Sequence, residues 1–145
     1  MFAKIIVPVD LADVEIAQPA IQTAIGLAAS ASAQVRLVYV RSILPVTFME
    51  YVPPAFDEEQ QDEAESKLAA LAAKIDLPAG RVTWAVRMGA VYNEVLTEAK
   101  SFGADLVVVG SHRPGMASYL LGSNAGTIVR HATCSVLVVR EAKSA

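Results

Sequence analysis

The chain has 145 residues, of which 54% are hydrophobic and 19% charged, and its formal net charge at pH 7 is −3. This length suits one domain with a buried core, and no apolar run reaches the roughly 18 to 20 residues of a membrane span. The acidic balance excludes a typical nucleic-acid surface, which needs concentrated Lys and Arg. The single cysteine cannot form an intramolecular disulfide, so a reducing cytoplasm is the predicted location.

Strands and helices are predicted to alternate along the chain. In order, they are a strand at 4–9, a helix at 14–31, a strand at 34–40, a helix at 57–75, a strand at 81–87, a helix at 90–101, a strand at 105–109, a helix at 123–131 and a strand at 135–140. Pro19 predicts that the first helix either bends there or begins near Gln18. Strands separated by helices indicate crossover connections, and therefore a parallel sheet with helices on both faces.

The carboxyl ends of the predicted strands are the places where such a sheet binds ligands, at the point where the strand order reverses. The first strand delivers Pro8, Val9 and Asp10 to that edge. The second delivers Val40, and the fourth delivers Gly110 and the loop that follows it. If the first and fourth strands flank the reversal, these groups line one crevice.

A loop that contains glycine joins the fourth strand to a helix, and this helix is predicted to begin at Gly122, Ser123 and Asn124. Backbone N–H groups and the positive end of a helix can hold a phosphate there without any catalytic side chain. The structural alternatives are that Gly110 and Gly115 are only turn residues, and that the polar side chains only cap the helix. The pattern favours a nucleotide-binding domain.

Other nucleotide and catalytic signatures do not fit. Gly110 and Gly115 have the spacing of a P-loop, but Met116 and Ala117 stand where its Lys and its Ser or Thr must follow. No glycine-rich turn follows the first strand, and no Gly-x-Ser-x-Gly elbow exists. The chain has two histidines, too few for a histidine-rich metal site. Cys134 is interpreted as a small buried packing residue, and Trp84 as a packing residue in its strand.

Three segments resemble the universal stress protein family. They are Val-Val-Val-Gly-Ser-His-Arg-Pro at 107–114, Leu-Leu-Gly-Ser-Asn-Ala at 120–125, and Val-Arg-His-Ala-Thr-Cys-Ser-Val-Leu-Val-Val-Arg at 129–140. The opening Ile-Ile-Val-Pro-Val-Asp also resembles that family's first strand and its acidic residue, here Asp10. The resemblance implies one universal stress protein domain over residues 1–145, with a doubly wound α/β fold and a five-stranded parallel sheet of order 3-2-1-4-5. It also implies homodimers and, in one branch of the family, ATP held by a Gly-x2-Gly-x9-Gly-Ser/Thr loop.

The chain departs from that loop pattern at Arg113, which occupies the second glycine position, and the spacing to Gly122 is one residue short. Gly115 is expected to supply the missing flexibility, and the Arg113 guanidinium can face phosphate. The predicted ligand is ATP, alone or with Mg²⁺, with adenine between the first-strand end and Val40 and ribose beside Gly110. The predicted binding residues are Pro8, Val9, Asp10, Val40, Gly110, His112, Arg113, Gly115, Gly122, Ser123 and Asn124.

The predicted function is that of a nucleotide-dependent stress-response sensor with at most slow ATP hydrolysis, because no lysine emerges at these strand ends. A nucleotide-free oligomeric interaction or chaperone-like protein is the alternative, and a flavoprotein-like or adenylating enzyme is a third. Self-association is predicted from the surplus of apolar residues. The strand at 136–140 is expected to pair with its copy in a dimer. The apolar segment at 41–56 either forms a tetramer contact or folds back on its own domain.

Overall fold

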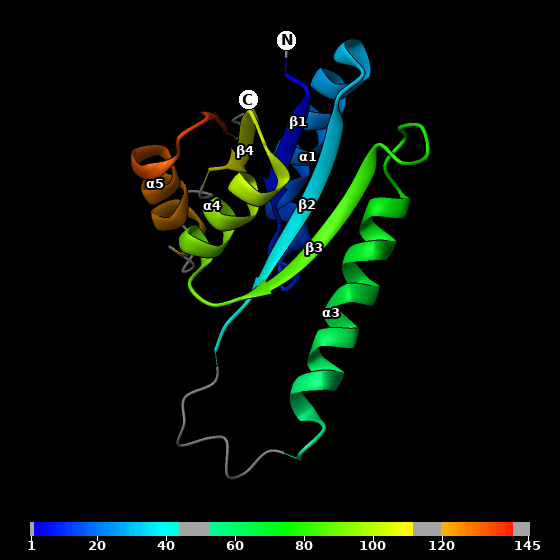
Figure 1. Ribbon diagram of the computed structural model, residues 1–145, viewed down its shortest axis with the longest axis vertical. Coiled ribbons are helices and arrows are strands. Elements are labelled where there is room, and N and C mark those ends of the chain that lie inside the picture. Colours follow the sequence, from blue (N-terminus) through cyan, green and yellow to red (C-terminus); the bar gives the residue numbers. More distant parts are fainter. Residues whose placement is uncertain (1, 44–52, 112–119, 141–145) are drawn as a thin grey trace, which may run out of the picture.

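The computed structural model of the chain describes residues 2–43, 53–111 and 120–140. Its elements are β1 (Lys4–Pro8), α1 (Val14–Ala31), β2 (Gln34–Arg41), α3 (Phe56–Ala73), β3 (Val82–Met88), α4 (Val91–Phe102), β4 (Leu106–Gly110), α5 (Leu120–His131) and β5 (Ser135–Val139). The five strands are parallel and lie in the order β3-β2-β1-β4-β5. This single α/β domain confirms the predicted fold class and strand order (Figure 1).

Successive strand residues point to opposite faces of the sheet, and each face carries its own apolar core. Ile5 and Val7 of β1 belong to the core that α1 and α3 cover. Ile6, between them, belongs to the core that α4 and α5 cover. Because the central strands are buried on both faces, they appear in the sequence as continuous Val, Ile and Leu runs, as in Leu106–Gly110.

Two helix starts differ from the prediction. Helix α1 begins at Val14 and contains Pro19, so a start near Gln18 is wrong. A proline at this early position removes only the hydrogen bond back to the first turn, which the rest of an 18-residue helix tolerates. Helix α5 begins at Leu120 rather than at Ser123, because the two leucines before Gly122 are good helix formers. Ser123 and Asn124 are therefore residues inside the helix and do not cap its start.

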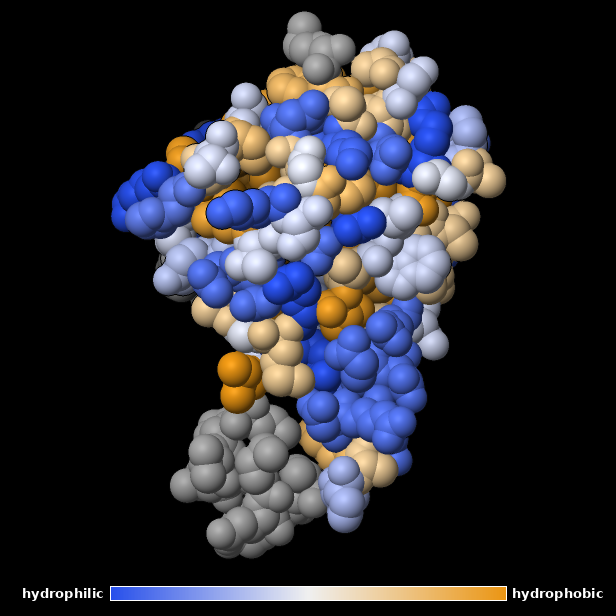
Figure 2. Space-filling model, viewed as in Figure 1, coloured by the Kyte–Doolittle hydropathy of each residue, from blue (hydrophilic) through white to orange (hydrophobic). Residues whose placement is uncertain are grey.

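Helix α3 buries only three residues, Ala64, Leu68 and Ala72, all in the part that lies against the sheet. Its first turns extend past the ends of β2 and β3 (Figure 1). Asp57, Glu58 and the next acidic residues favour this end because they complement the helix dipole. Figure 2 shows the resulting hydrophilic surface over the exposed side of the helix. None of the helices within the described ranges is long and apolar enough to cross a membrane.

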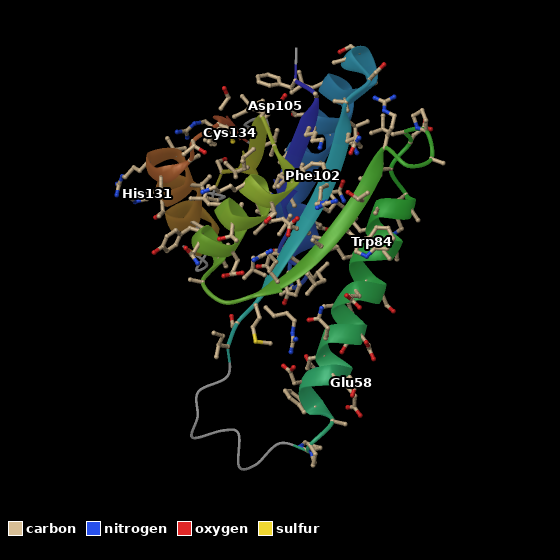
Figure 3. All side chains as sticks on the ribbon, viewed as in Figure 1. Glu58, Trp84, Phe102, Asp105, His131 and Cys134 are labelled. Atoms are coloured by element: carbon tan, nitrogen blue, oxygen red, sulfur yellow. The ribbon has the colours of Figure 1, made fainter. Side chains whose placement is uncertain are left out.

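Asp105 ties the start of β1 to β4 (Figure 3). Its two carboxylate oxygens accept hydrogen bonds from the backbone N–H groups of Ala3 and Lys4, at 2.8 and 3.1 Å. The backbone N–H of Asp105 in turn donates to the carbonyl of Lys4 at 3.0 Å. One carboxylate therefore aligns the first residues of the central strand with its neighbour.

Replacing Asp105 with Ala is expected to lower the free energy of unfolding by about 1 to 3 kcal/mol, because two backbone donors lose a charged acceptor. Urea denaturation followed by circular dichroism measures this change. Asp105→Asn is the matched control, since it keeps one carbonyl oxygen, and it should lose less. Equal stability of the Ala variant and the unmodified protein would contradict this role for Asp105.

Candidate functional site

The strand order reverses beside β1, which lies between β2 and β4. The register pairs Ile6 with Val107 of β4 on one side and Pro8 with Val38 of β2 on the other. The helices that follow β1 and β4 cover opposite faces of the sheet, and in sheets of this kind a ligand crevice is expected where two such connections part. The structure therefore confirms the strand arrangement on which the predicted site depends.

Five predicted residues meet at this edge. Pro8 ends β1 and is buried, and Val9 donates its backbone N–H to the carbonyl of Val38 at 2.8 Å. Asp10 follows and is exposed. Val40 lies near the end of β2, and Gly110 is the buried last residue of β4. Apolar walls and an exposed carboxylate thus come together from three adjacent strands.

Asp10 organises the turn that leads into α1. One of its carboxylate oxygens accepts the backbone N–H of Ala12 at 2.9 Å, and its carbonyl accepts the N–H of Asp13 at 3.1 Å. The N-cap position of α1 belongs to Asp13, and Asp10 precedes that cap by three residues. Its turn holds the exposed carboxylate at the crevice edge.

The remaining predicted residues belong to the segment after β4. Ser111 donates its backbone N–H to the carbonyl of Val139 at 2.9 Å, which extends the β4–β5 pairing by one residue. His112, Arg113 and Gly115 lie outside the described residues. Gly122, Ser123 and Asn124 occupy the first turns of α5, where the backbone is described from Leu120 and the side chains from Asn124 onward.

A cavity of about 680 Å³ opens beside this edge, on the side of the sheet that α1 and α3 cover. We call it the α3 cavity. Its walls come from the connection after β1, the ends of β2 and β3, and the first turns of α3; they are Leu11, Ala12, Tyr39, Arg41, Ser42, Ile43, Pro53, Pro54, Phe56, Asp57, Gln60, Glu63, Ala64, Lys67 and Met88. The sequence pattern did not predict this cavity, because its walls come from segments that are far apart in the chain.

An ion-pair cluster on the other face was also missed. Glu98 of α4 binds Arg36 of β2 at 2.7 Å and Arg87 of β3 at 3.0 Å, and Arg87 also binds Glu94 at 2.8 Å. Hydrogen bonding to Glu94 is the main cause that raises the pKa of Arg87, against the opposing effect of desolvation. The Arg36 guanidinium lies 4.1 Å from the centroid of the Phe102 ring. This cluster joins α4 to the sheet, and its member Arg87 pairs in register with Val40 of β2.

Cys134 and Trp84, which the sequence singled out, do not line the α3 cavity. Cys134 is half-buried beside the core of α4 and α5, and desolvation is the main cause that raises the pKa of its thiol. It therefore packs as interpreted and is a poor nucleophile at neutral pH. Trp84 lies on the edge strand β3, and the residue is 45% exposed. Its interpretation as a packing residue is therefore only partly correct. Across the described ranges, no three His, Cys, Asp or Glu side chains are grouped to hold a metal ion.

A parallel sheet with this strand order and helices on both faces defines a doubly wound α/β protein, a class that commonly binds ligands at strand ends. The family model of the universal stress proteins matches residues 1–140, and the chain belongs to this family. Universal stress protein G of Escherichia coli O157:H7 is 34% identical over 146 residues, which cover 97% of this chain and all of the relative.

Two solved structures share the fold at lower identity. UspA from Lactobacillus plantarum is 23% identical with a TM-score of 0.75, over 95% of this chain and 97% of that one. A universal stress protein solved in complex with cAMP is 22% identical with a TM-score of 0.59, over 95% of this chain and 96% of that one. Both support the α/β architecture described above.

Proposed function

We propose that this universal stress protein binds ATP in the crevice beside β1 and acts as a nucleotide-dependent sensor in the stress response. The observation that carries the proposal is the meeting of Pro8, Val9, Asp10, Val40 and Gly110 at the point where the strand order reverses. In sheets of this kind, ligands bind outside the carboxyl ends of the strands at that point. The neighbour that binds cAMP carries an adenine nucleotide on the same fold, which supports the same ligand class here.

In the proposed complex, adenine lies between the end of β1 and Val40, where buried apolar walls suit a purine. Ribose lies beside Gly110, which has no side chain to obstruct it. The phosphates take the N-terminal turns of α5 at Gly122, Ser123 and Asn124, with Arg113, His112 and Gly115 supplied by the loop before that helix. A Mg²⁺ ion that accompanies ATP would be held mainly by phosphate oxygens. Asp10, which directly follows β1, would supply a carboxylate ligand.

The proposed role is sensing, with hydrolysis at most slow. Enzymes that transfer phosphoryl groups commonly hold the phosphates with a lysine, and among the described residues directly after β1, β2 and β4 no lysine occurs. Binding of ATP would order the loop before α5 and so change the surface that a partner or a second subunit contacts. The cytoplasmic location stays a prediction.

Gly122→Val is expected to weaken ATP binding about tenfold or more, because a branched side chain would stand where phosphate approaches the backbone. Isothermal titration calorimetry measures the affinity. Gly126→Val is the matched control: Gly126 is exposed one turn further along α5, and a Cβ there meets no atom within 4 Å. Unchanged ATP affinity in Gly122→Val would remove the phosphate assignment.

The second candidate is an oligomeric interaction protein that acts without nucleotide. The exposed apolar residues of the edge strand β5, Leu137 and Val138, favour self-association whether or not ATP binds. We propose antiparallel pairing of β5 with its copy in a two-fold dimer. A tetramer contact through residues 41–56 is the further proposal, of which residues 44–52 lie outside the described ranges.

Mass spectrometry of the protein purified without added nucleotide separates the two candidates. A bound ATP mass supports the sensor. Protein that carries no nucleotide and gives no heat with ATP in calorimetry supports the interaction protein.

A further inference from the structure

We propose that the α3 cavity binds a small apolar organic acid, at a site separate from the proposed nucleotide crevice. The volume of about 680 Å³ falls within the range of about 300 to 1,000 Å³ that small-molecule sites span. The cavity lies at the carboxyl ends of β2 and β3, where an α/β sheet commonly places a ligand. One buried cation and several apolar walls define the class of ligand.

Among the described residues, the walls of the cavity include large apolar side chains with high exposure. Ile43 is 68% exposed, and Met88 is among the other large apolar residues with high exposure. Phe56 and the ring of Tyr39 supply aromatic surface on the same cavity. A ligand with a compact apolar body would cover this surface and gain its burial free energy.

Arg41 provides the charge. Its residue exposure is 9%, and its guanidinium donates to the side-chain oxygen of Gln61 at 2.9 Å and to the carboxylate of Asp57 at 2.8 Å. Of its five N–H groups, these two are the ones with a partner among the described residues. The side chain of Asp57 is 70% exposed, so solvent weakens the attraction between its carboxylate and the buried guanidinium of Arg41.

An acid group on the ligand would complete this arrangement, because an arginine can bind a carboxylate or sulfonate through two parallel N–H donors. The other charges on the cavity do not reverse this preference. Lys67 and Glu63 form their own ion pair at 2.9 Å, and both side chains are more than half exposed. With Asp57, the four charged residues of the lining sum to zero, and the cation Arg41 is the buried member of the set.

The cavity and the nucleotide crevice lie on different sides of the β1–α1 connection. Leu11 and Ala12, which follow Asp10, line the cavity on the side of α1 and α3. Helix α5, where the phosphates are proposed, covers the opposite face of the sheet. Both ligands are thus expected to bind at once, with their sites joined through a short turn.

Anilinonaphthalene sulfonate, an aromatic anion that fluoresces when buried, is the probe for this site. The folded protein is expected to bind one equivalent, with unchanged affinity when ATP is saturating. Arg41→Gln should weaken binding about tenfold, because a charge-assisted contact is lost. The matched control Lys74→Gln removes an exposed cation at the C-terminal end of α3, outside the cavity lining, and should change the affinity less than about twofold.

Gln60→Trp provides a second, independent test, because Gln60 lines the cavity from an exposed turn of α3 and a larger side chain there fills the space. This variant should lose probe binding while ATP affinity is retained. The test still decides the matter if Arg41→Gln fails to fold. The proposal is overturned if folded Arg41→Gln or Gln60→Trp binds the probe as the unmodified protein does, or if ATP displaces the probe.

Discussion

Glu98→Ala is expected to destabilise the protein by about 3 kcal/mol, since removing one partner from a buried ion pair leaves its charge uncompensated. The side chain of Glu98 is 8% exposed and binds two arginines, Arg36 and Arg87. Without it, the partners that remain among the described residues are the hydroxyl of Thr83 and the Phe102 ring for Arg36, and Glu94 for Arg87. About a quarter of each arginine side chain is exposed, so water recovers part of the loss.

Urea denaturation followed by circular dichroism measures this change in the free energy of unfolding. Glu63→Ala is the matched control, because Glu63 pairs with Lys67 on the exposed side of α3, and its loss should cost less than about 1 kcal/mol. If the Glu98 variant loses no more stability than the Glu63 variant, the cluster does not hold α4 on the sheet.

Val138→Pro is expected to convert the proposed dimer to monomer or to insoluble protein. The carbonyl of Val139 accepts a hydrogen bond from Ser111, so the backbone groups of Val139 point toward β4. Because backbone groups alternate along a strand, those of Val138 point away, toward the open edge of the sheet. Proline at 138 therefore deletes a donor that a second β5 would use, while the β4–β5 hydrogen bonds remain.

Light scattering or sedimentation measures the assembly state. Val138→Ala is the control: it keeps the backbone donor and removes only side-chain surface, so it should remain a dimer, weakened at most. A soluble dimer of unchanged mass in the proline variant would place the interface elsewhere on the molecule.

The order of elements followed from local sequence alone. Apolar runs such as Ile5–Val7 and Leu106–Val109, separated by stretches with helical periodicity, predict alternating strands and helices, and crossovers then require a parallel sheet. Strand ends were predicted well for the same reason, since a buried run stops where polar or glycine residues begin. The strand order 3-2-1-4-5 came from the family resemblance, because periodicity says nothing about which strands are neighbours.

The shared edge of Pro8, Val9, Asp10, Val40 and Gly110 could be predicted because these residues end strands or directly follow them, and parallel strands all end at one edge. The ligand site at this edge stays a prediction. The α3 cavity and the Glu98 cluster could not be predicted. Glu98 and Arg36 are 62 residues apart, and Arg41 is 20 residues from Gln61 and 16 from Asp57. Local pattern places each of these residues on its own element, but the distance between two elements depends on how they pack.

The sequence by itself determined the elements, the class of fold and the edge where a ligand is expected, since these depend on residues close together in the chain. Only the tertiary structure decided that Trp84 on an edge strand stays nearly half exposed and that Arg41 is buried at the wall of a cavity. These features depend on packing between distant segments. There, burial and charge compensation outweigh local preference.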